Sequence, residues 1–103
     1  MTLDDLSIVH HFGDDEYIKE THIKAGTELE QHKHKHSHLS VLVSGKALVT
    51  VDGVPKEHNG YCTLLVPANK SHKVYAYTDC IWLCVWGGTK GKTAETVDEG
   101  LIA

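Results

Sequence analysis

The chain has 103 residues, 41% of them hydrophobic, and a formal net charge of −4 with neutral histidines. This length allows one domain with one modest core. The acidic balance and the absence of a basic run argue against nucleic acid as a partner, and no apolar run is long enough to cross a bilayer.

Turn-forming residues divide the chain into short, strand-like segments. Glycine-containing turns are expected at 25–27, 44–45, 52–53 and 59–60, and a further turn at 35–37. Asp52-Gly53 is a strong signal for a two-residue hairpin, because both residues tolerate a positive φ. Pro55 places the returning strand at a sheet edge. The expected strands are, besides that one, 17–24, 29–34, 38–43, 47–51, 61–66, 72–78 and 80–86.

This pattern predicts an all-β protein. No segment before residue 90 has helical periodicity, and several short strands with frequent turns indicate a sandwich or barrel. We expect a single domain over 1–103, with a core at about 17–86. An arm at 1–16 holds an edge strand, and the polar tail at 89–103 either forms a short helix at 93–99 or stays loose.

Strand 38–43 carries apolar residues on both faces. Leu39, Val41 and Val43 share one face, and His38, Ser40 and Leu42 share the other. We expect a second sheet to cover one face and a partner subunit to cover the other, which predicts a homodimer.

Four alternating histidines, His32, His34, His36 and His38, suggest a metal site. In an extended strand, residues two apart share a face about 6.6 Å apart, so neighbouring imidazoles can reach one ion at about 2.0–2.1 Å. A helix would scatter them around its axis. The alternative is an exposed histidine-rich tract that binds metals loosely. The other histidines, His10, His11, His22 and His58, have no spacing partner and are expected on the surface or in structural roles.

Two glycine–histidine patterns connect these residues to a known family. Gly26, His32-Lys33-His34, His38 and Gly45 fit every spacing of G(X)5HXH(X)3,4E(X)6G, the first cupin motif, with His38 in place of Glu. The second motif, G(X)5PXG(X)2H(X)3N, is matched more loosely, by Gly60, Pro67, Asn69, His72 and Ala76. Over about 17–86 the chain therefore resembles a small, cupin_2-like cupin. That resemblance implies a double-stranded β-helix, or jelly-roll barrel.

The resemblance also implies a ligand set, carried over position by position as His32, His34, His38 and His72. Four neutral imidazoles leave a divalent ion its full +2 charge, which attracts anionic substrates or oxygen species. Nitrogen ligation suits Fe, Mn, Ni, Cu or Zn and disfavours Mg and Ca. His36 shares the parity of these ligands, and it stands either at the barrel mouth or in place of one of the four.

Further residues are candidates for the pocket wall. Ser40 shares the face of His38 and either hydrogen-bonds a substrate or ligand or simply packs. Trp82 and Cys84 share one face of the last strand with Trp86, while Ile81, Leu83 and Val85 share the other, and either face can line the pocket. The cysteines, Cys62, Cys80 and Cys84, include no CxxC pair and are expected as reduced thiols.

The resemblance implies first a mononuclear metalloenzyme that oxidises a small organic molecule in a dioxygenase-type reaction. One alternative is an isomerase, cyclase or lyase in which the metal is only a Lewis acid. Another is a binding module that holds a metal or small molecule without turnover. The N-terminus lacks the features of a signal peptide, so we expect a cytoplasmic homodimer with a small-molecule partner and without nucleic-acid or membrane partners.

Overall fold

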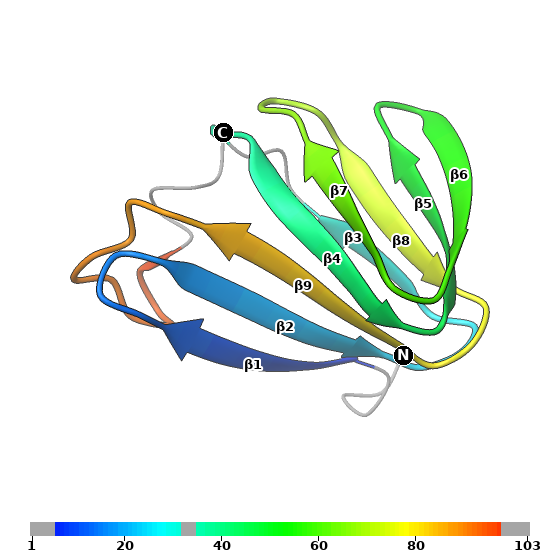
Figure 1. Cartoon of the computed structure of the whole chain (residues 1–103), viewed down its shortest axis with the longest axis horizontal. Helices are drawn as coiled ribbons and strands as arrows, with labels where there is room; N and C mark the ends of the chain where they lie inside the picture. Colours follow the sequence, from blue (N-terminus) through cyan, green and yellow to red (C-terminus); the bar gives the residue numbers. More distant parts are fainter. Residues whose placement is uncertain (1–5, 32–34, 98–103) are drawn as a thin grey trace.

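Two antiparallel sheets make up the structure, which is a computed structural model describing residues 6–31 and 35–97 (Figure 1). Within these residues the prediction of an all-β jelly-roll barrel is confirmed. No helix in the described ranges is long and apolar enough to cross a membrane. The strands are β1 (Leu6–Phe12), β2 (Tyr17–Ile23), β3 (Glu28–Gln31), β4 (His38–Ser44), β5 (Lys46–Val51), β6 (Val54–Asn59), β7 (Cys62–Val66), β8 (His72–Ala76) and β9 (Cys80–Trp86).

Strands that are distant in the sequence lie side by side in each sheet. In the described part of the chain, the large sheet has the order β1-β2-β9-β4-β7, and the small sheet has the order β3-β8-β5-β6. Every neighbouring pair is antiparallel. Figure 1 shows β9 and β4 in the middle of the large sheet, with β8 and β5 on the small sheet behind. The two inner faces meet to form the core.

Alternating burial along β9 shows which of its faces is internal. Trp82 and Cys84 are fully buried, whereas Leu83 and Val85 between and beyond them are only half-buried. Successive side chains of a strand point to opposite faces, so the tryptophan–cysteine face packs against the core. The buried residues around it are contributed by both sheets and include Ile23, Leu42, Ala47, Val49, Val74 and Ala76.

The predicted hairpin and its edge strand are both confirmed. Asp52 and Gly53 have φ values of 51° and 79°, as a two-residue turn between antiparallel strands requires. Pro55 lies opposite Thr50 in β6, the outer strand of the small sheet. A proline there removes no ladder hydrogen bond from the sheet interior.

At the Gly45 turn the backbone has a positive φ and a side chain would have no room. Its φ is +96°, and a Cβ atom at this position would stand 2.4 Å from the Asp79 carbonyl oxygen and 2.7 Å from Cys80 Sγ. Both the backbone conformation and the close approach of the 79–80 segment therefore require glycine. This turn sets how β4 leads into β5.

Some strand boundaries differ from the sequence-based expectation. The predicted strand 72–78 ends at Ala76, because Tyr77 and Thr78 instead donate their amides to the Lys46 carbonyl oxygen in the turn. The tail makes a helical turn in which the amide of Val97 donates to the Thr93 carbonyl oxygen, and Val97 is buried. The described residues leave the outward face of β4 open, since Leu39 there is 52% exposed.

Candidate metal centre

Three potential metal ligands meet in the interior between the sheets. His38 of β4, His72 of β8 and Cys84 of β9 each offer one donor atom, and these atoms all lie within 4.8 Å of one another. The residues are 4%, 2% and 0% exposed, respectively. Buried donors of this kind either pair with one another or bind a cation.

Strand register brings these three side chains together. Cys84 lies directly opposite Ser40 on the neighbouring strand, two residues from His38, and all three point inward. His72 opens β8 in the facing sheet, where it is paired with Val51 on one side and Gln31 on the other. The site therefore spans both sheets and depends on how they face each other.

A stack of aromatic rings backs the ring of His38. The His38 and Trp86 ring centroids are 4.5 Å apart, and Trp86 stacks in turn on Tyr17 at 5.8 Å with planes 12° apart. The Tyr17 hydroxyl lies 2.7 Å from His10 Nδ1, and Phe12 stacks on the Tyr17 ring at 4.8 Å. These contacts restrict the rotation of the His38 ring and exclude water from one side of the cluster.

Polar side chains continue from the cluster into the barrel. Ser40 Oγ lies 3.4 Å from Cys84 Sγ, and both residues are fully buried. Trp82 lies two residues before Cys84 on β9, and it is paired with Thr21 on β2. Thr21 Oγ1 and Trp82 Nε1 are buried without a hydrogen-bond partner among the described residues. Buried polar atoms of this kind usually bind water or a ligand, so the interior offers polar contacts beside its apolar walls.

Two surface hollows lie near the cluster. One of about 300 Å³ is lined by His72 together with Thr50, Ser71 and Lys73. Another of about 280 Å³ is mostly apolar and includes Val51, the residue paired with His72. Both volumes lie close to the lower end of the range of about 300–1,000 Å³ that is typical of small-molecule sites in proteins.

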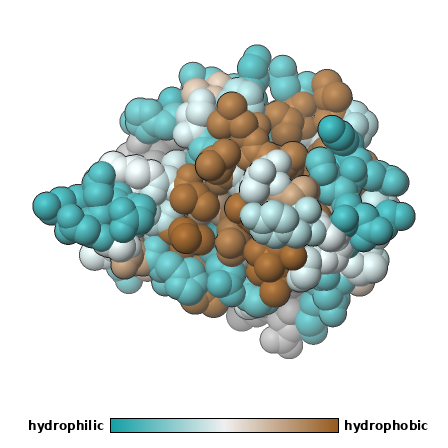
Figure 2. All heavy atoms as spheres, viewed as in Figure 1, coloured by the Kyte–Doolittle hydropathy of each residue, from teal (hydrophilic) through white to brown (hydrophobic). Residues whose placement is uncertain are grey.

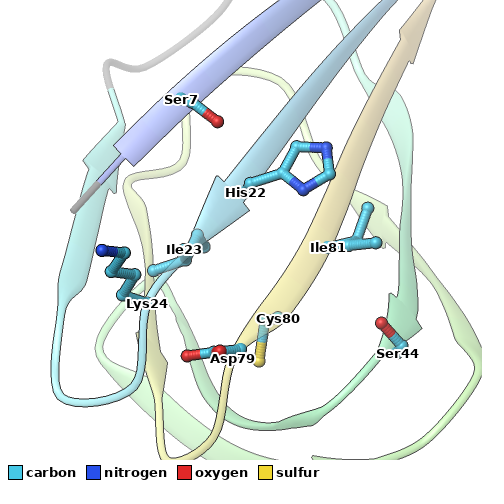
Figure 3. A pocket seen from close by; sticks show the side chains of 8 residues that line it. All are labelled: Ser7, His22, Ile23, Lys24, Ser44, Asp79, Cys80 and Ile81. Carbon is cyan, nitrogen blue, oxygen red and sulfur yellow. The ribbon is translucent and has the colours of Figure 1, made fainter. Parts of the chain in front are cut away.

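A further hollow lies at the other end of the barrel (Figure 3). It has a volume of about 310 Å³ and is lined by residues that include Ser44 and Cys80, at the ends of β4 and β9 opposite to His38 and Trp86. Burial raises the pKa of the Cys80 thiol, which donates hydrogen bonds to the carbonyl oxygens of Lys46 and Thr78. Among the described residues, the three convergent ligand atoms belong to the buried cluster and do not line this hollow.

Two of the remaining histidines are held by a surface carboxylate. His11 and His22 place their Nε2 atoms 3.0 and 2.5 Å from the two oxygens of Glu20. Hydrogen bonds from His22 and His11 lower the pKa of Glu20. These residues lie on β1 and β2, on the outer face of the large sheet, where they act structurally.

The sequence-predicted site residues fall into three groups. His38, His72, Ser40, Trp82 and Cys84 are buried in the barrel interior. His36 is exposed on the bend that precedes β4. His32 and His34 lie outside the described residues. Sequence reasoning placed Cys84 in the pocket wall but missed it as a candidate ligand, because only the register with Ser40 and the facing sheet bring it close to the histidines.

Comparison with protein families gives one match. A family model described as a cupin domain, Cupin_2, matches residues 19–86. A comparison with curated proteins finds no match.

Several solved structures share the fold. A RmlC-like cupin from Shewanella frigidimarina is 25% identical with a TM-score of 0.72, over 84% of this chain and 79% of the other. A conserved protein of unknown function from Streptococcus pyogenes is 22% identical with a TM-score of 0.71, over 89% and 80% of the two chains. A salicylate 1,2-dioxygenase from Pseudaminobacter salicylatoxidans is 13% identical with a TM-score of 0.73. It is matched over 79% of this chain but only 26% of its own.

Proposed function

This chain belongs to the Cupin_2 family of cupin domains, and on that premise we propose that it is a metal-dependent enzyme acting on a small organic molecule. The proposed reaction is an oxidation of the dioxygenase type. The observation that carries the proposal is the convergence of His38, His72 and Cys84 in a buried site. Imidazole and thiol donors suit divalent transition metals such as Fe, Mn, Ni, Cu or Zn, and not Mg or Ca.

The proposed ligand set is His32, His34, His38 and His72. Support for the last two is their placement, with ring centroids 5.5 Å apart in the interior. Support for the first two is the position of Gln31, the residue before His32, which is paired with His72 at the end of β3. β3 therefore ends beside His72, one residue before the histidine motif in the sequence.

In this proposal, the residues of the protein bind the metal ion, orient its ligands and shield the site from water. Neutral imidazoles would hold the ion through their ring nitrogens, while the Trp86–Tyr17 stack holds the His38 ring in its orientation. When bound, the metal would supply a centre at which a small substrate and O2 react. Thr21 Oγ1 and Trp82 Nε1 offer hydrogen bonds to a substrate in the barrel.

The similarity to the salicylate 1,2-dioxygenase supports the fold and leaves the substrate to experiment. Protein purified without added metal should be analysed for its metal, then loaded with Fe(II) or Mn(II) and assayed for oxygen uptake with phenols, diketones, thiols and small acids. Uptake with one class supports the oxidation. Bound metal without uptake from any class would contradict it and favour a Lewis-acid reaction or a binding module.

We also propose that the chain forms a homodimer through the outer face of the large sheet. Figure 2 shows hydrophobic side chains gathered across the front of the molecule, where Figure 1 shows β9 and β4. Leu39 on β4 and Leu65 on β7 lie opposite each other on this face and are 52% and 63% exposed. Leu39 is also paired with Val85 of β9. Exposed apolar side chains gathered on one face of a sheet favour association with a second copy of the chain.

A further inference from the structure

We infer that Cys84 is itself a metal ligand, so that the ion in the barrel is held by sulfur as well as by imidazole nitrogen. This inference rests on the proposed metal centre and changes its donor set. The four-histidine motif includes no sulfur, and the sequence analysis placed Cys84 only in the pocket wall. In the structure, however, Cys84 Sγ and a nitrogen of each buried histidine all lie within 4.8 Å of one another.

The separation of these atoms suits one shared ion. Around a tetrahedral ion with Zn–N bonds of about 2.0–2.1 Å and Zn–S bonds of about 2.3 Å, donor atoms stand about 3.3–3.6 Å apart. Shifts of about 1 Å in the side chains bring His38, His72 and Cys84 to such spacing. Cys84 lies in the middle of the large sheet, between β2 and β4, so its position is fixed by pairing on both sides.

The other cysteines do not share this environment, and they provide internal controls. Cys80 lies at the far end of β9 from Trp86, and its thiol donates to the carbonyl oxygens of Lys46 and Thr78. Cys62 is half-buried at the start of β7, paired with Leu42. A sulfur atom found on the ion therefore points to Cys84.

Sulfur ligation changes the charge and the selectivity of the centre. On binding, the S–H bond of Cys84 breaks, a metal–sulfur bond forms and the proton passes to solvent. One thiolate reduces the net charge of a divalent centre from +2 to +1, whereas four imidazoles leave it unchanged. Thiolate also favours softer ions such as Zn and Cu over Mn. Ser40 Oγ, at 3.4 Å from the sulfur, is placed to donate a hydrogen bond to the thiolate.

X-ray absorption spectroscopy of the full chain loaded with Zn²⁺ tests this directly. The wild-type spectrum should show a sulfur shell at about 2.3 Å beside nitrogen at about 2.0–2.1 Å. A Cys62→Ser, Cys80→Ser double variant should keep the sulfur shell, because it leaves Cys84 as the remaining thiol. Cys84→Ser and Cys84→Ala should lose it, with circular dichroism confirming that each variant is folded.

The possible outcomes distinguish a failure of the Cys84 proposal from a failure of the metal-centre proposal. Zinc bound only by nitrogen and oxygen in the wild type and in the double variant overturns the role of Cys84 and leaves the histidine centre intact. No bound zinc at all overturns both proposals. Because the wild type and the double variant alone decide the result, a failure of the Cys84 variants to fold does not weaken the test.

Discussion

His38 and His72 lie on different sheets, yet their ring centroids are 5.5 Å apart and their planes are tilted by 54°. One residue opens β4 in the large sheet and the other opens β8 in the small sheet. An ion bound by both would therefore cross-link the two layers of the barrel. Metal binding and the stability of the fold should be coupled.

Removal of metal should lower the thermal stability of the protein. A ligand that binds only the native state stabilises it by about 2.7 kcal/mol when its free concentration is 100 times Kd. For a chain of this size, that should raise Tm by roughly 10 °C or more. Scanning calorimetry with Zn²⁺ and with a chelator measures the shift. A His38→Ala variant should lose most of the shift, and an equal shift in that variant would argue against a buried site.

Replacing Gly45 by alanine should be more damaging than replacing Gly53. Both glycines have positive φ, at 96° and 79°, but a Cβ at Gly53 meets nothing within 4 Å, whereas one at Gly45 overlaps Asp79 and Cys80. Gly53→Ala should cost about 1–2 kcal/mol from backbone strain alone, and Gly45→Ala about 3 kcal/mol. Urea unfolding gives both values. Equal losses would show that close packing at Gly45 is unimportant.

The sequence predicted much of the fold and part of the site, for identifiable reasons. The turn at Asp52-Gly53 is a local pattern, and the positive φ of both residues shows that such a pattern determines a turn directly. The alternation of side chains along a strand predicted that Trp82 and Cys84 share one face of β9. It did not predict which face is internal, because both faces are apolar. That choice depends on which strands flank β9, and on which side the other sheet packs.

Long-range packing also accounts for what the sequence did not reveal. Cys84 and His72 come close because the large and small sheets pack face to face. The spacing of residues within either segment does not predict this contact. Asn69 departs from the glycine of the second motif, yet its φ of 61° is the conformation glycine would adopt there. Asparagine tolerates this conformation better than most residues do, so the departure leaves the turn before His72 intact.

Glu20 should stabilise the fold only above the pH range in which it is protonated. Its pKa is lowered by hydrogen bonds from His22 and His11, so its stabilising effect is present above the unfolded value of about 4.3 and is lost as pH falls through the folded value. The Tm difference between wild type and Glu20→Gln should be clear at about pH 6 and vanish as the carboxylate is protonated. Glu30→Gln controls for net charge. A difference that persists in acid would argue against this role.

Introducing a charged side chain on the outer face of the large sheet should dissociate the dimer. Leu39→Glu or Leu65→Glu should give monomers, because a buried carboxylate without a partner is strongly unfavourable at an apolar interface. Val54→Glu is the matched control, since Val54 is 68% exposed on β6 of the other sheet. Sedimentation velocity measures the masses of the wild type and of the three variants. A wild type that sediments near 11.4 kDa would contradict the homodimer.

The most direct test of the metal centre is the number of ions bound per chain in matched histidine variants. After Zn²⁺ loading and dialysis, the wild type should keep one ion per chain, and a His38→Ala, His72→Ala double variant should keep none. A His11→Ala, His22→Ala double variant, which removes the same number of histidines from the surface, should still keep one. One tightly held ion in the His38, His72 variant would contradict the buried centre and indicate binding by the histidine-rich segment alone.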